Sequence, residues 1–91
     1  MWVVYILECK DGSFYTGVTS DLDRRLKEHR EGTSHYTGYN PPIRLIYRES
    51  HMAKTGAEKR EAQIKRWSKA KKSALIDGDH ALLKKLSLSR D

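Results

Sequence analysis

The chain has 91 residues, with 18 lysines and arginines against 12 aspartates and glutamates, and a single cysteine. This length allows one domain with one core, and no apolar run of about 18 residues or charged-then-apolar leader indicates membrane spanning or secretion, so we expect a cytoplasmic protein. Cys9 has no partner for an internal disulfide or a zinc-finger spacing, and we expect it to be a buried thiol.

The N-terminal segment predicts a β-hairpin. Residues 2–9 are almost continuously apolar and rich in β-branched and aromatic types, which is typical of a strand covered on both faces. Residues 10–13 supply turn-forming types, and residues 14–19 predict the second strand. Gly17 inside this second strand indicates that some group approaches the backbone closely there.

The register of the hairpin decides whether Tyr5 and Tyr15 share a face of the sheet. A two-residue turn would pair position 5 with position 18 and place the tyrosines on opposite faces. An odd-length turn with a bulge at Gly12 would pair Cys9 with Tyr15 and place both tyrosines on one face. A shared site for the two tyrosines therefore predicts the bulged turn, and core packing is the alternative explanation for each tyrosine alone.

The chain after the hairpin predicts helices with one further strand and no second domain. Ser20 with Asp23 and Thr55 with Glu58 are possible N-terminal capping pairs of the first and second helices. Gly32 and Gly78 are expected to end the first and third helices. The predicted elements are a helix from 20 to about 31, a loop over 32–42, a strand over 43–47, a helix from between 54 and 57 to about 67, a helix over about 69–77, and an amphipathic stretch over 81–86 capped by Asp79.

Two polar side chains lie toward the inward face of the first predicted helix. At about 100° per residue, His29 lies between Leu22 and Leu26 in direction, and Arg25 lies about 60° from Leu22. Inward imidazole and guanidinium groups need polar partners. His29 is therefore a satisfied core histidine or a functional group, and Arg25 either extends to solvent from the rim or binds a ligand.

Glu61 lies at the edge of the inward face of the second long helix. Ala57 and Ile64 define this face, and Glu61 lies about 40° from Ala57. Its structural alternative is a salt bridge to Arg25 or a lysine. Its functional alternative is an oxygen ligand for Mg²⁺ or Mn²⁺, because such ions commonly take one or two carboxylates and keep several waters.

Basic side chains outnumber acidic ones by eight to two within residues 54–72. This excess fits a surface that neutralises phosphates, and a solvated helix face is the alternative. The expected nucleic-acid contacts are Gly17, Lys54, Lys59, Lys65, Arg66, Lys69, Lys71 and Lys72. His35, Tyr36, Tyr39 and Asn40 in the predicted loop are further candidates.

The order of these residues resembles the GIY-YIG endonuclease superfamily. Its two namesake motifs correspond to Val3-Val4-Tyr5 and Tyr15-Thr16-Gly17, followed by Arg25 with His29 on one helix and Glu61 on a later helix. Residues 4–29 and 58–76 look more narrowly like small stand-alone bacterial GIY-YIG proteins of an uncharacterised protein family. The resemblance covers about residues 2–77. The chain departs from the pattern by lacking the first motif's glycine and by having Thr16 for isoleucine.

The resemblance implies an α/β (α+β) fold in which helices flank a three-stranded antiparallel sheet. The nuclease-like domain would span residues 1–78, and residues 79–91 would form a helical tail of the same domain. The implied catalytic residues are Tyr5 and Tyr15, one of which helps to deprotonate the attacking water, Arg25 at the scissile phosphate, His29 as a hydrogen-bonding assistant, and Glu61 as the ligand of Mg²⁺ or Mn²⁺.

The function implied by the resemblance is metal-dependent hydrolysis of phosphodiester bonds in DNA. We expect a structure-selective or weakly sequence-specific endonuclease in DNA repair or processing, because no extra recognition element is present to read base edges. The alternatives are a non-catalytic DNA- or RNA-binding module and an accessory protein recruited by a partner. We expect nucleic acid rather than a membrane as partner, and a monomer or weak dimer.

Overall fold

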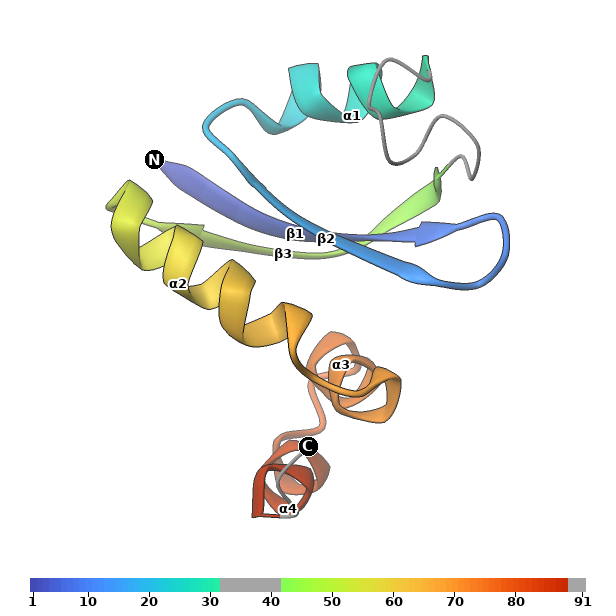
Figure 1. Ribbon diagram of the computed structural model, residues 1–91, viewed down its shortest axis with the longest axis vertical. Coiled ribbons are helices and arrows are strands. Elements are labelled where there is room, and N and C mark those ends of the chain that lie inside the picture. The colour runs from blue at the N-terminus through green and yellow to red at the C-terminus, as the bar shows by residue number, and fades with distance from the viewer. Residues whose placement is uncertain (32–41, 89–91) are drawn as a thin grey trace.

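Three antiparallel strands and four helices make up the protein, in a computed structural model that describes residues 1–31 and 42–88. The elements are β1 (Trp2–Cys9), β2 (Phe14–Thr19), α1 (Leu22–Arg30), β3 (Pro42–His51), α2 (Lys54–Lys65), α3 (Lys69–Ile76) and α4 (His80–Leu88). The strand order is β2-β1-β3, with β1 in the centre. Figure 1 shows α1 on one face of the sheet and α2 crossing the other, which confirms the expected fold.

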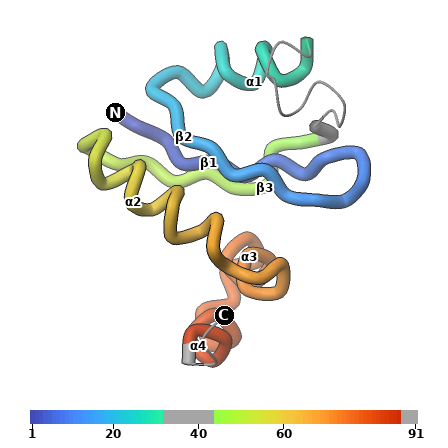
Figure 2. The backbone as a smooth tube through the Cα atoms, in the orientation of Figure 1, coloured from blue at the N-terminus to red at the C-terminus, as the bar shows by residue number. Residues whose placement is uncertain are grey.

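The central strand β1 is buried on both faces and divides the core in two. Its odd-numbered side chains, from Val3 to Leu7, pack with Leu22 of α1. Its even-numbered side chains pack with Ala57 and Ile64 of α2. Cys9 is a buried free thiol, as expected. The chain continues into α3, whose Leu75 and Ile76 pack against the cluster on the α2 side, and then into α4, which lies further from the sheet, as the tube in Figure 2 shows.

The hairpin closes with a three-residue connection. Gly12 has a φ of 85°, its N–H donates to the Cys9 carbonyl at 2.9 Å, and the Cys9 N–H donates to the Ser13 carbonyl at 2.9 Å. Cys9 therefore faces Ser13 across the turn, and two residues further along each strand Leu7 lies opposite Tyr15. The expected pairing of Tyr15 with Cys9 is therefore wrong, whereas the odd-length connection and the shared face of both tyrosines are confirmed.

Several predicted element ends are corrected by the structure. The N-cap of α1 is Asp21 rather than Ser20, because the Asp21 carboxylate accepts a bond from the Arg24 N–H at 3.1 Å. The Thr55 and Glu58 capping box is absent, since α2 begins at Lys54 without a side-chain cap. Asp79 does cap α4 as expected, through its carboxylate and the Leu82 N–H at 3.0 Å.

Strand β3 continues to His51, four residues beyond the predicted end. Its second half is polar, but it pairs with β1 along the whole length, with Glu49 opposite Val4 and His51 opposite Trp2. Residues 32–41, which hold most of the predicted loop and its four candidate residues, lie outside the described residues. In the described ranges, no helix combines the length and apolar character needed to cross a membrane.

Candidate active site

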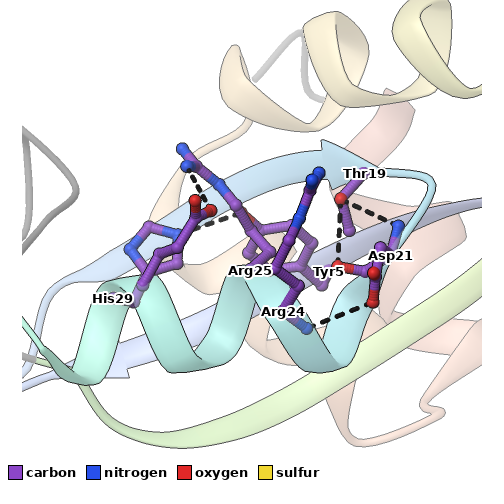
Figure 3. Close-up of polar contacts among 7 residues, drawn as sticks. Tyr5, Thr19, Asp21, Arg24, Arg25 and His29 are labelled. Atoms are coloured by element: carbon purple, nitrogen blue, oxygen red, sulfur yellow. Dashed lines mark hydrogen bonds and ion pairs between the residues drawn. The ribbon is translucent and has the colours of Figure 1, made fainter.

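Tyr5, Arg25 and His29 meet between β1 and α1. The Tyr5 hydroxyl lies 3.0 Å from His29 Nε2, and Arg25 Nε donates to the same hydroxyl at 3.4 Å. Tyr5 is 1% exposed and His29 is 0% exposed. Figure 3 shows the side chains of Arg25 and His29 rising from α1 beside the Tyr5 ring.

Local structure explains why these three groups meet. Tyr5 is on the α1 side of the central strand, among Val3 and Leu7. Arg25 and His29 are four residues apart and therefore lie one above the other on a helix. Burial of Leu22 one turn earlier fixes which side of α1 faces the sheet. Both polar groups predicted to face inward therefore do so, and each has a partner.

Tyr15 completes the cluster from β2. Its ring centroid lies 6.3 Å from that of Tyr5 and 5.0 Å from that of His29, and the contact with His29 is edge-on at 63°. Tyr15 is half-buried, whereas Tyr5 is fully buried. The two tyrosines thus occupy one face of the sheet, with Tyr15 nearer to solvent.

Burial disfavours the charged forms of both central groups. It raises the pKa of Tyr5 to about 12, against a lowering effect of the Arg25 hydrogen bond. It also lowers the pKa of His29, and the nearby Arg25 cation lowers that pKa further. Since the guanidinium has only donors, the Tyr5 oxygen accepts from Arg25. In the contact with His29, the phenol donates to Nε2 when the imidazole carries its hydrogen on Nδ1, and Nε2 donates to the phenol in the other tautomer.

Stability should depend on pH through His29. Its folded-state pKa is below the unfolded value of 6.5, so the unfolded chain binds more protons between these two pKa values. The stabilisation is thus complete above 6.5 and is lost as pH falls from there through the folded-state pKa. Thermal unfolding between pH 8 and 5 should show this loss in the wild type and a smaller loss in His29→Gln. Equal slopes in both proteins would contradict a buried neutral imidazole.

The Tyr5 ring lies directly over Gly17 of β2. A Cβ at position 17 would come within 2.5 Å of both the ring carbon Cζ and the hydroxyl of Tyr5. This close approach explains the glycine inside a strand. It also gives Gly17 a role in packing Tyr5, while its expected contact with nucleic acid stays a prediction.

Gly17→Ala should therefore destabilise the fold and displace the Tyr5 hydroxyl. We expect a loss of about 1–3 kcal/mol in the free energy of unfolding, as for other overpacked sites, measured by urea denaturation. Gly56→Ala is the matched control, because its Cβ would meet only His51 Nδ1 at 3.8 Å. That helical substitution should be neutral or stabilising by up to about 1 kcal/mol. Equal stability of the two variants would exclude the close packing of Tyr5 on position 17.

Glu61 is the carboxylate of α2 that lies within electrostatic reach of Tyr5. Its charge contributes to raising the Tyr5 pKa, although α2 covers the opposite face of the sheet from α1. The side chain is 21% exposed, and Oε2 lies 3.6 Å from Lys65 Nζ. The structural alternative predicted from sequence, an ion pair with a lysine, is thus present, while Arg25 pairs instead with Glu28 at 3.2 Å.

The donors around Glu61 fit a divalent cation that keeps most of its water. Among residues 1–31 and 42–88, no three His, Cys, Asp or Glu side chains gather closely enough to form a metal cage. A single half-buried carboxylate is nevertheless compatible with Mg²⁺ or Mn²⁺, which are often bound by one or two carboxylates together with substrate phosphates and water. The residues present therefore fit a cation whose binding depends on substrate.

The basic side chains of residues 54–72 do not form one surface. Lys54 lies over the Trp2 ring, and Lys69 donates to the Gly12 carbonyl at 2.9 Å beside Phe14. Lys71 is 6% exposed, with Nζ 4.5 Å from the centroid of Trp67. Lys71 is therefore removed from the expected phosphate contacts, because its ammonium is covered by the protein.

Lys72 is also partly withdrawn from solvent. It is half-buried, and this burial lowers its pKa. Lys59 and Lys65 on α2 are exposed, and so is Arg66 at the C-cap of this helix. Exposure thus leaves these three, with Lys54 and Lys69, as the basic side chains best placed to meet a nucleic acid.

Sequence reasoning missed a second polar cluster, centred on Glu49 of β3. The Glu49 carboxylate accepts from Tyr47 at 2.5 Å and from Arg60 Nε at 3.1 Å, and its Oε2 lies 2.6 Å from His51 Nε2. These bonds lower the pKa of Glu49 although burial acts in the opposite direction. The alternation of Tyr47, Glu49 and His51 was the available signal, but the strand was predicted to end at residue 47.

A model of the GIY-YIG catalytic domain matches residues 1–74. The chain belongs to the GIY-YIG family. A UPF0213 protein of Halobacterium salinarum is 45% identical over 74 residues, covering 80% of this chain and 96% of that protein. A UPF0213 protein of Staphylococcus saprophyticus is 43% identical over 74 residues, covering 80% and 90%.

Two solved structures have the same GIY-YIG fold. The solution structure of the UPF0213 protein BH0048 from Bacillus halodurans has a TM-score of 0.56 and 44% identity, covering 85% of this chain and 84% of that one. The solution structure of EF2693 from E. faecalis has a TM-score of 0.60 and 34% identity, covering 87% and 85%. GIY-YIG domains form a nuclease superfamily whose members typically depend on divalent metals, and the UPF0213 names state no activity.

Proposed function

We propose that this GIY-YIG protein is a metal-dependent endonuclease that hydrolyses phosphodiester bonds in DNA. The observation that carries the proposal is the buried contact of the Tyr5 hydroxyl with both His29 and Arg25. A buried phenol between a neutral base and a fixed cation is more than core packing requires. Tyr15 and Glu61 lie close enough to this phenol to influence its pKa.

Tyr5 and His29 would act together as a proton relay. With a pKa of about 12, Tyr5 cannot hold a phenolate at neutral pH in the free protein. With His29 in the tautomer that carries its hydrogen on Nδ1, the phenol would donate its hydrogen to the neutral Nε2 as the phenol oxygen takes a proton from the attacking water. His29 would then carry the former phenol proton, Tyr5 would carry the proton from water and end the step as a phenol, and the water would attack as hydroxide.

Arg25 would neutralise the phosphate. Its pKa is raised, first by the hydrogen bond to Tyr5, so it stays a cation throughout. To reach a phosphate oxygen it would exchange its contact with Glu28, a part-exposed pair of the kind worth about 0–1 kcal/mol. A guanidinium beside the reacting phosphate stabilises the negative charge that develops there.

Glu61 would hold the divalent cation. Its ion pair with Lys65 is likewise weak, because the lysine is half exposed. Mg²⁺ or Mn²⁺, when bound, neutralises phosphate charge and lowers the pKa of water. Lys65 is then free to contact the nucleic-acid backbone beside the site.

Structure selectivity or weak sequence specificity is proposed because the described helices and strands already cover the sheet and include no additional base-reading element. Phosphate contacts orient a nucleic acid but carry no sequence information. Such an activity suits DNA repair or processing. We propose a monomer or weak dimer, in which one active site cuts one strand.

The direct test is cleavage of labelled supercoiled, single-stranded and branched DNA, and of matched RNA, with Mg²⁺, Mn²⁺ or EDTA. Metal-dependent cutting of DNA supports the proposal. Binding without cutting under all conditions would instead support the alternative, a non-catalytic nucleic-acid-binding module. The Glu61 to Lys65 ion pair is the observation that favours this alternative.

A further inference from the structure

A depression of about 370 Å³ lies on the outward side of α2, away from the candidate catalytic residues. Its lining residues are Lys59, Ala62, Gln63, Arg66 and Trp67. At about 100° per residue, Lys59, Gln63 and Arg66 lie roughly 140–160° around the helix from Glu61. The depression is therefore a separate place from the site built around Tyr5 and Glu61.

The lining offers hydrogen-bond donors and positive charge. Lys59 and Arg66 are exposed cations, and no acidic side chain is among the lining residues that the structure describes. The carbonyl oxygen of the Gln63 side chain accepts from Arg60 Nη1 at 2.9 Å. Because guanidinium can only donate, this contact fixes the amide orientation and leaves the Gln63 NH₂ group as a donor. Such a set of groups matches an anion.

The wall of the depression is held in place from within the fold. Arg60 Nε donates to both carboxylate oxygens of Glu49, at 3.2 and 3.1 Å. The Arg60 guanidinium lies 5.1 Å from the ring centroid of Trp67. One arginine thus fixes both Gln63 and Trp67, and Glu49 fixes the arginine. The cluster centred on Glu49 thus holds the lining residues in place before a ligand arrives. A site arranged in this way loses less conformational entropy on binding.

We propose that this depression binds one phosphodiester of a nucleic-acid strand, with the attached nucleotide against Trp67. The volume is at the small end for ligand pockets, which suits a single nucleotide rather than a folded partner. An aromatic side chain beside cations is the usual combination for binding single strands. The inference rests on the proposed function, because the strand bound here belongs to the nucleic acid that is cleaved at the site built around Tyr5 and Glu61.

The test follows the NMR signals of the full chain with the single-stranded hexamer of thymidylate in EDTA, where cleavage does not occur. The Trp67 indole N–H and the Gln63 side-chain amide should shift. In the variant carrying Lys59→Glu and Arg66→Glu, affinity should fall about tenfold and the salt dependence of binding should lose about one to two ion contacts. The variant carrying Lys84→Glu and Lys85→Glu, two exposed charge reversals on α4, is the matched control and should change affinity less than about twofold.

Two results would overturn the inference. One is an equal loss of affinity in the control variant with Lys84→Glu and Lys85→Glu, and the other is a larger shift of the Trp67 and Gln63 signals with hexaglutamate than with the hexamer. Its failure is distinguishable from failure of the proposed hydrolysis. Shifts at the depression in a protein that cuts no DNA would sustain the inference alone, and cleavage without these shifts would sustain the hydrolysis alone.

Discussion

Replacing Glu61 by alanine is expected to lower metal-dependent DNA cleavage by a factor of about 10³ or more. A metal ion supplies several kcal/mol of charge stabilisation to a phosphoryl transition state, and each 1.4 kcal/mol is about tenfold in rate. Glu61 is the carboxylate of α2 whose charge reaches Tyr5. The half-buried Glu61 to Lys65 pair contributes little to stability, so the variant should remain folded. The measurement is the initial nicking rate at several Mg²⁺ concentrations.

Glu58→Ala provides the matched control on the same helix. Glu58 is exposed, and its replacement by alanine removes the same negative charge as Glu61→Ala. Its loss should leave the nicking rate within about twofold of the wild type, because it lies about 60° further from the buried face than Glu61. Equal activity of the Glu61 and Glu58 variants would show that Glu61 holds no catalytic cation.

Replacing Tyr5 by phenylalanine is expected to lower the cleavage rate by about 10²–10⁴, the usual contribution of a positioned proton-transfer group. The ring that packs over Gly17 is kept, so only the hydroxyl between Arg25 and His29 is lost. His29 Nε2 would lose its phenol partner, which should cost about 1–3 kcal/mol of stability. Single-turnover rates at saturating DNA measure the catalytic effect apart from binding.

Tyr47→Phe is the control for this second substitution. Tyr47 is also a strand tyrosine with a raised pKa, about 12, but its hydroxyl donates to Glu49 and belongs to the core on the α2 face. We expect a loss of stability with an unchanged single-turnover rate. A similar fall in rate for both variants would mean that general loosening of the sheet, and not the Tyr5 hydroxyl, limits cleavage.

Local patterns were sufficient to predict much of the fold and of the Tyr5 cluster. Alternation and turn chemistry predicted the hairpin, and the even or odd length of its connection alone decided whether Tyr5 and Tyr15 share a face. The helical period placed Arg25 and His29 toward the sheet. These features depend on neighbours close in sequence, which is why they could be predicted without coordinates.

Features that depend on packing between distant segments could not be predicted. The polar end of β3 is a strand because β1 offers it partners, which propensity does not show. Lys71 was expected at the surface, but α3 lies so that its ammonium covers Trp67. The depression lined by Lys59, Arg66 and Trp67 becomes visible only once α2 and the residues that follow it are placed in the fold.

The most direct test of the central claim is a double-mutant cycle on the nicking rate of supercoiled DNA with Mg²⁺, using Tyr5→Phe, Glu61→Ala and the double variant. Groups that act as one catalytic unit show strongly non-additive losses. We predict that the double variant is about as slow as the slower single variant. Multiplicative losses would show that Tyr5 and Glu61 act independently, and unchanged rates in both single variants would contradict the assignment of the active site.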